Sequence, residues 1–153
     1  MAIAASTNIA QRTARTIWTG RLASGSGAIT SGSGALGELP VTWAARTQQS
    51  NGQTSPEELA AAAHASCFSM ALALRLGEHQ ATARRIDVGA TVSLDDVDGK
   101  PTVATSALVV HAEVPDLDKA TFDTIIEEAA GLCPISRLFA GAQITIDATL
   151  DPS

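Results

Sequence analysis

Residues 55–76 read SPEELAAAAHASCFSMALALRL, and this stretch predicts one long helix. Ser55 can cap the helix, Pro56 suits its first position, and the two glutamates that follow complement the positive end of the helix dipole. Gly77 supplies a stop, so we expect the helix to end near Leu76. The many alanines allow other elements to approach this helix closely.

Strand signals lie on both sides of the helix. Before it, residues 13–22 and 40–45 each carry one tryptophan and β-branched residues, and a glycine- and serine-rich zone separates them, which predicts an antiparallel meander. After it, residues 86–94 alternate strictly between apolar and polar, as in a strand with one buried face. Asp98-Gly99 marks a turn before a second alternating run over residues 103–114, so the two runs predict a hairpin.

Two more helices and a last strand complete the pattern. We expect a helix from Asp118 to Gly131, a short helical turn from Pro134 to Phe139, and a strand over residues 144–150. The predicted order is β-β-β-α-β-β-α-α-β. It indicates a single α+β domain over residues 1–153, with two main helices packed on antiparallel sheets.

Composition excludes several classes of function. The net charge is −6 and the ten Lys and Arg residues form no cluster, so nucleic acid is not an expected partner, since binding to phosphates relies on clustered cations. Residues 1–6 lack the features of a signal peptide, and no later run approaches the ~20 apolar residues of a membrane span. We therefore expect a cytoplasmic protein without a membrane partner.

The two cysteines, Cys67 and Cys133, are the strongest clue to function. A chain of this length builds a core without disulfides, so redox-active or inert thiols are expected rather than a secreted framework. A cysteine reacts as its thiolate, which a helix N-terminus stabilises. Cys133 stands directly before Pro134, where free backbone N–H groups can face its sulfur, whereas Cys67 lies deep inside the long helix and needs another source of stabilisation.

Histidines offer one candidate partner for a thiol. His64 precedes Cys67 by one helical turn, but side chains at this spacing point outward rather than toward each other, so an ordinary hydrogen-bonded histidine is the favoured interpretation. His79 and His111 have the sequence context of surface positions. No closely spaced ligand pairs occur, so no metal is expected.

The residues around both cysteines resemble those of the OsmC/Ohr family. The resemblance rests on the long helix from Ser55 through Cys67 to Leu72, on the Val92-Ser93-Leu94-Asp95 strand with Val97-Asp98-Gly99, and on Cys133-Pro134-Ile135-Ser136. These motifs occur in order over nearly the whole chain. The resemblance implies a peroxidase that reduces organic hydroperoxides, and hydrogen peroxide less well, with Cys67 as the peroxidatic and Cys133 as the resolving cysteine, joined in a disulfide during turnover.

The resemblance also implies partners and further site residues. It implies no bound cofactor but an external dithiol, of the dihydrolipoyl type or a lipoylated protein, as reductant. It implies an arginine–glutamate pair beside the nucleophile, which assigns Glu57 and favours Arg46 over its rival Arg21. Ten helical residues span roughly 15 Å, so Glu57 cannot touch Cys67 of the same straight helix. An intertwined homodimer, as the family forms, would let a second chain supply it.

Alternatives remain in two other classes of protein. A redox sensor would form the same disulfide with little turnover, and a structural dimer module would keep inert, buried thiols. Apolar residues near the cysteines could line a substrate pocket or simply belong to the core; these are Phe68, Met70, Leu138 and Phe139.

Overall fold

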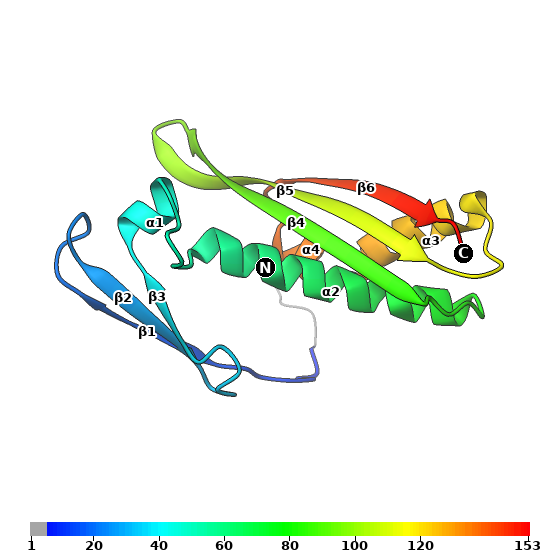
Figure 1. Ribbon diagram of the computed structural model, residues 1–153, viewed down its shortest axis with the longest axis horizontal. Helices are drawn as coiled ribbons and strands as arrows, with labels where there is room; N and C mark the ends of the chain where they lie inside the picture. Colours follow the sequence, from blue (N-terminus) through cyan, green and yellow to red (C-terminus); the bar gives the residue numbers. More distant parts are fainter. Residues whose placement is uncertain (1–5) are drawn as a thin grey trace. The chain divides into compact units, whose positions relative to one another are not determined.

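The computed structural model describes residues 6–153 and divides into two compact units, one ending at Ser55 and the other beginning at Pro56 (Figure 1). Residues 1–5, which make up most of the segment expected to lack a signal peptide, lie outside the described residues. The mixture of helices and sheets confirms the predicted α+β class.

The first unit is built on a three-stranded antiparallel meander, as predicted. Its strands are β1 (Ala14–Thr19), β2 (Ser26–Ser31) and β3 (Glu38–Val41), in the order β1-β2-β3. Gly27 allows the neighbouring strands to pack closely, because a Cβ atom there would lie 2.7 Å from the side chain of Val41.

A short helix, α1 (Trp43–Thr47), follows the meander where extended chain was expected. Thr42 ends the strand, because its side-chain oxygen accepts a hydrogen bond from the N–H of Ala45 at 3.1 Å and caps the new helix. The observed order is therefore β-β-β-α-α-β-β-α-α-β, with one helix more than predicted.

The second unit joins a long helix to a sheet. Its elements are α2 (Pro56–Glu78), β4 (Arg85–Val97), β5 (Lys100–Glu113), α3 (Lys119–Leu132), α4 (Pro134–Leu138) and β6 (Gln143–Asp151). α2 begins at the predicted proline and runs past Gly77. Asp98 and Gly99 both have positive φ, 52° and 76°, and form the predicted two-residue turn between β4 and β5.

The pairing of β6 corrects the prediction of antiparallel sheets. β4 and β5 are antiparallel, but β6 lies parallel to β5, from Thr105 opposite Gln143 to Glu113 opposite Asp151. The chain between the two strands forms α3 and α4, and such a long crossover returns the chain to the same end of the sheet. A parallel pair follows from this connection.

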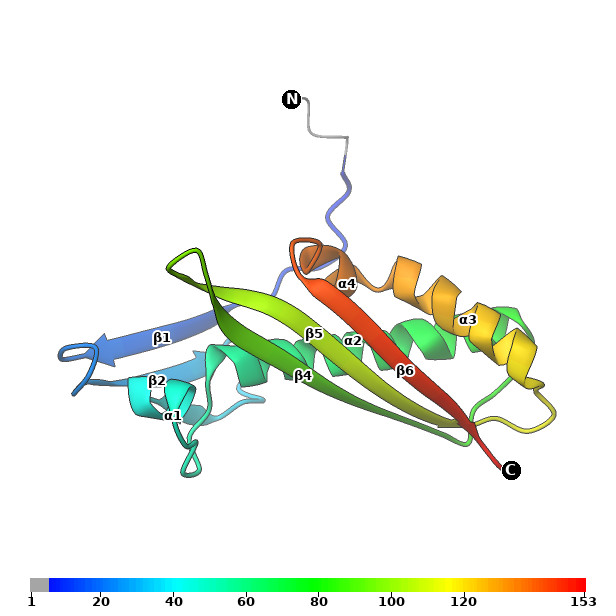
Figure 2. The same cartoon turned by 90° about the horizontal axis from the view of Figure 1, so that it is seen from above.

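The core of the second unit lies between the sheet and its helices. α2 and α3 cover one face of the β4-β5-β6 sheet (Figure 2). Buried side chains come from α2, β5 and α3, including Phe68, Leu72, Leu108, Val110 and Phe122. Both cysteines pack in this cluster, so the core itself positions the thiols.

α2 also presents apolar side chains outward. Met70 is 66% exposed and Leu74 is 53% exposed. The helix is long and apolar enough to cross a membrane by length and composition alone, so the expectation that no run approaches this size was wrong. A core helix of a folded domain meets the same criterion, and one face of α2 is packed into the core of the second unit.

Candidate active site

The fold brings Cys67 and Cys133 together as free thiols. Cys67 lies in the middle of α2, and Cys133 lies at the junction of α3 and α4, where its N–H donates to the carbonyl of Ala129 at 3.0 Å. The two side chains interact directly and influence each other's ionisation. Cys133 is fully buried, whereas Cys67 is only partly buried. Cys67 is therefore the thiol that a reactant from solvent meets first.

The surroundings of the two thiols differ in their effect on ionisation. Burial raises the pKa of Cys67, and the neighbouring Cys133 raises it further, against the opposing effect of the backbone N–H of Ile135. Burial also acts to raise the pKa of Cys133, but the hydroxyl and N–H of Ser136, together with Cys67 and the N–H of Ile135, outweigh it, so the net pKa is lowered. Cys133 is the N-cap residue of α4 and Ser136 lies in the first turn of that helix, so the Ser136 dipoles lie close to the Cys133 sulfur.

A buried histidine joins three elements beside the thiols. His64 on α2 is fully buried, with Nδ1 2.6 Å from the hydroxyl of Ser106 on β5 and Nε2 2.8 Å from the hydroxyl of Ser136 on α4. The ring of Phe139 packs edge-on against it, 5.2 Å between centroids. Burial lowers the pKa of His64. His64 is thus a hydrogen-bonded histidine, and not the partner of Cys67, as the favoured interpretation held.

Ser106 and Ser136 were not among the residues predicted from the sequence. Ser106 is a polar residue on the inward face of β5, which it shares with the buried Leu108 and Val110. A polar side chain at a core position requires a hydrogen-bond partner, so a serine within this alternating apolar pattern could have indicated a buried polar site. Ser136 lies in the Cys133-Pro134 motif, but only the folded chain shows that it faces His64.

Of the predicted charged residues, Glu57 belongs to the second unit, whereas Arg46 and Arg21 belong to the first. Glu57 is 9% exposed in the first turn of α2, so the unbroken helix confirms its separation of roughly 15 Å from Cys67 in the same chain. Arg46 lies in α1, with its guanidinium 5.8 Å from the ring centre of Trp43. Arg21 is exposed in the turn between β1 and β2. The catalytic roles of these residues stay predictions.

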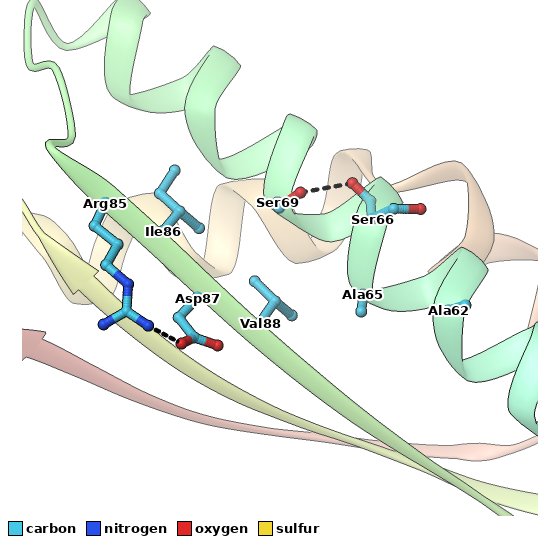
Figure 3. Close-up of a pocket in the computed structure, with 8 residues that line it drawn as sticks. All are labelled: Ala62, Ala65, Ser66, Ser69, Arg85, Ile86, Asp87 and Val88. Atoms are coloured by element: carbon cyan, nitrogen blue, oxygen red, sulfur yellow. Dashed lines mark hydrogen bonds and ion pairs between the residues drawn. The ribbon is translucent and has the colours of Figure 1, made fainter.

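The apolar residues considered for a substrate pocket have different surroundings. Phe68 is fully buried in the core, whereas Leu138 is 73% exposed. Of the two interpretations left open, Phe68 therefore fits core packing. A groove of about 390 Å³ instead runs between α2 and β4, and neither cysteine lines it (Figure 3). Its lining residues are Ala62, Ala65, Ser66, Ser69, Arg85, Ile86, Asp87 and Val88.

The remaining histidines form surface pairs. His79 lies 2.9 Å from Glu128 and His111 lies 3.2 Å from Asp151, and all four side chains are at least one-third exposed. Among residues 6–153, no group of three His, Cys, Asp or Glu side chains is placed to hold a metal ion.

Two free thiols that affect each other's ionisation, one buried and one partly exposed, have the arrangement that dithiol–disulfide exchange requires. The chain belongs to the OsmC family, because the family model described as OsmC-like protein matches residues 49–149. The Escherichia coli (strain K12) protein named peroxiredoxin OsmC is 44% identical over 130 residues, which cover 85% of this chain and 90% of that protein. These findings confirm the resemblance seen in the sequence.

Solved structures share the fold. The organic hydroperoxide resistance protein OhrB of Bacillus subtilis matches with a TM-score of 0.72 and 27% identity, over 90% of this chain and 98% of that one. An OsmC-like protein from Mycoplasma pneumoniae matches with a TM-score of 0.74 at 14% identity, over 95% of this chain and 100% of that one. The second match shows only that the fold persists at low identity.

Burial of a neutral His64 predicts that acid destabilises the folded chain. Since its pKa is lowered by folding, its contribution to stability is fully present above the ordinary histidine pKa of 6.5 and is lost as the pH falls below it. The free energy of unfolding, from urea titrations at fixed protein concentration, should fall between pH 7 and pH 5 by at most about 1.4 kcal/mol per pH unit for this one group.

The matched variants are His64→Gln and His79→Gln. The slope of stability against pH should be smaller in His64→Gln and unchanged in His79→Gln, whatever the absolute stability of each variant. Equal slopes in His64→Gln and the unsubstituted protein would show that His64 is not held neutral.

Proposed function

We propose that the protein is a thiol-dependent peroxidase that reduces organic hydroperoxides to alcohols, and hydrogen peroxide more slowly. Its family membership and its 44% identity to a protein named peroxiredoxin support this function. The observation that carries it is the contact between an accessible Cys67 and a buried Cys133. This arrangement allows one thiol to react with an oxidant and the other to resolve the product.

Cys67 acts as the peroxidatic nucleophile. Its thiolate attacks the terminal oxygen of the hydroperoxide, the O–O bond breaks, and the departing alkoxide takes up a proton and leaves as the alcohol. The sulfur, oxidised by two electrons, becomes a sulfenic acid. Cys67 fits this role better than Cys133 because the sulfur of Cys133 is closed off from solvent.

Cys133 resolves the sulfenic acid. Its thiolate attacks the Cys67 sulfur, the S–OH bond breaks, and the hydroxide leaves with a proton as water, so that a Cys67–Cys133 disulfide forms. An external dithiol, of the dihydrolipoyl type or carried on a lipoylated protein, then reduces this disulfide by two electrons. The cycle uses no bound cofactor.

Arg46 supplies the positive charge that Cys67 needs. Burial raises the pKa of this thiol, and the neighbouring Cys133 raises it further. A guanidinium beside the sulfur would stabilise the thiolate and polarise the peroxide, and a glutamate would hold the guanidinium in place. We assign these roles to Arg46 and Glu57, with Arg21 as the rival arginine.

A homodimer completes this assignment. Glu57 lies roughly 15 Å along α2 from Cys67, so in our proposal a second chain brings a glutamate to the site. The exposed Met70 and Leu74 and the small residues of α2 provide a surface that a second copy can bury, rather than a membrane segment. We treat residues 1–153 as one domain of a cytoplasmic protein, where thiols stay reduced and nucleic acid is no partner for a chain of charge −6.

The roles of the two cysteines predict opposite fates on oxidation. Cys67→Ser should abolish reduction of cumene hydroperoxide, because the accessible nucleophile is lost. Cys133→Ser should still reduce one equivalent and then accumulate Cys67 sulfinic or sulfonic acid, because no thiol resolves the sulfenic acid. Stopped-flow peroxide consumption and mass spectrometry of the products measure both outcomes.

The same assays separate the competing classes. Steady consumption of peroxide with a dithiol donor is expected for the peroxidase, whereas a sensor would form the disulfide with negligible turnover. A structural module would resist oxidation altogether. If Cys133→Ser were inactive and Cys67→Ser formed the sulfenic acid, the two roles would be reversed.

Arg46→Ala should slow the first oxidation of Cys67 by about 100-fold, because it removes the charge that stabilises the developing thiolate and leaving oxygen. Arg21→Ala is the matched variant and should react at close to the original rate. The measurement is the pre-steady-state rate with excess cumene hydroperoxide. A large loss in Arg21→Ala with none in Arg46→Ala would transfer the role to Arg21.

A further inference from the structure

Four buried groups, from helices α2 and α4, strand β5 and the junction of α3 and α4, form a series that ends at Cys133. Ser106, His64 and Cys133 are fully buried, and Ser136 is 8% exposed. His64 connects the two hydroxyls at 2.6 Å and 2.8 Å, and the Ser136 hydroxyl acts on the Cys133 sulfur. We call Ser106, His64 and Ser136 the serine–histidine relay. It lies wholly within the second unit.

Counting protons fixes the direction of every bond in the relay when Cys133 is a thiolate. A thiolate can only accept, and the Ser136 hydroxyl, three residues after Cys133 in the first turn of α4, has the largest effect of the groups that favour the thiolate, so in the relay its single O–H is directed to the sulfur. Ser136 then has no proton for His64, so Nε2 of His64 carries the proton and donates to the Ser136 oxygen. Because buried His64 is neutral, its Nδ1 has no proton and accepts from the O–H of Ser106.

The opposite direction gives the thiolate less support. If Nδ1 of His64 carried the proton, Nε2 would need the proton of Ser136, and the thiolate would keep only the weaker influences of Cys67 and of the N–H groups of Ile135 and Ser136. One tautomer of His64 therefore matches the Cys133 thiolate, and the other matches the Cys133 thiol.

We propose that His64 is a positioning residue for the resolving half of the cycle, whose Nε2–H tautomer commits the Ser136 hydroxyl to the Cys133 thiolate. The proposal rests on the proposed function for its catalytic meaning. His64 touches neither the peroxide nor the reacting sulfur in this account, and it acts only through Ser136.

The relay serves both steps in which Cys133 carries negative charge. When the disulfide forms, Cys133 must attack the Cys67 sulfenic acid as a thiolate. When an external dithiol reduces the disulfide, its thiolate attacks the accessible Cys67 sulfur, the S–S bond breaks, and the electron pair leaves on Cys133. The second donor thiol then attacks the mixed disulfide, which oxidises the donor and releases Cys67. Stabilising the Cys133 thiolate increases the fraction of the nucleophile that is ionised in the first step and makes Cys133 a better leaving group in the second.

The electrostatics agree with this geometry. Despite burial, the pKa of Cys133 is lowered, and the Ser136 hydroxyl is the largest of the influences that lower it. Cys67 is the titratable group that acts on Cys133 directly, and His64 lies one hydroxyl further away.

The first test follows Cys133 alone. In a Cys67→Ser background, thiolate absorbance against pH reports the titration of the remaining cysteine. Ser136→Ala should move this titration to higher pH, and His64→Gln and Ser106→Ala should move it in the same direction by less, because they act through Ser136. His79→Gln, on the surface pair with Glu128, is the matched control and should leave it unchanged. An unchanged titration in Ser136→Ala would overturn the proposal.

The second test needs no change in the relay. In ¹⁵N-histidine-labelled Cys67→Ser protein, at a pH where Cys133 is ionised, the ring nitrogens of His64 should show the Nε2–H tautomer. The Nδ1–H tautomer under these conditions would overturn the proposal, even if His64→Gln fails to fold.

The third test connects the relay to turnover. Ser136→Ala with both cysteines present should slow reduction of the disulfide by a dithiol by about tenfold, with little change in the first oxidation of Cys67. Equal slowing of both steps would argue for a general structural effect and against the proposal. The titration and the tautomer are read without peroxide, so failure of the peroxidase function would leave them intact, and failure of the relay would leave peroxide reduction intact.

Discussion

The contact between Cys67 and Cys133 depends on how one face of α2 is buried. Phe68, Leu72 and Leu76 share a core with side chains of β5 and α3, and this packing fixes the rotation of α2. Cys67 precedes Phe68, so it lies at the margin of the core, partly open to solvent, while Cys133 is inside. A rotation of α2 would separate the thiols. The redox chemistry therefore depends on ordinary apolar packing.

The buried polar groups add specificity to this packing. An unpaired imidazole or hydroxyl in a core would be destabilising, so His64, Ser106 and Ser136 favour one alignment of α2, β5 and α4. The same hydrogen bonds that align the elements also reach Cys133 through Ser136. These three residues therefore have both a structural and a chemical role. Substituting one of them is expected to change the ionisation of Cys133 as well as the packing of the core.

Much of the fold could be predicted from local patterns, and the exceptions have physical reasons. The Ser55-Pro56 start of α2 and the Asp98-Gly99 turn depend on nearby residues and were predicted correctly. The parallel pairing of β6 depends on the path of α3 and α4, which alternation within the strand does not reveal. At the site, the cysteine motifs were visible in the sequence. The links from His64 to Ser106 and Ser136 span 42 and 72 residues and required the folded chain.

The central claim is that folding makes Cys67 and Cys133 partners within one chain. The most direct measurement treats the reduced protein with one equivalent of cumene hydroperoxide and analyses the intact protein and its non-reduced peptides by mass spectrometry. The account predicts the loss of two hydrogen atoms per chain and a single peptide pair joining Cys67 to Cys133 of the same chain. Oxygen addition to Cys67 without a disulfide, or a disulfide only between chains, would contradict it.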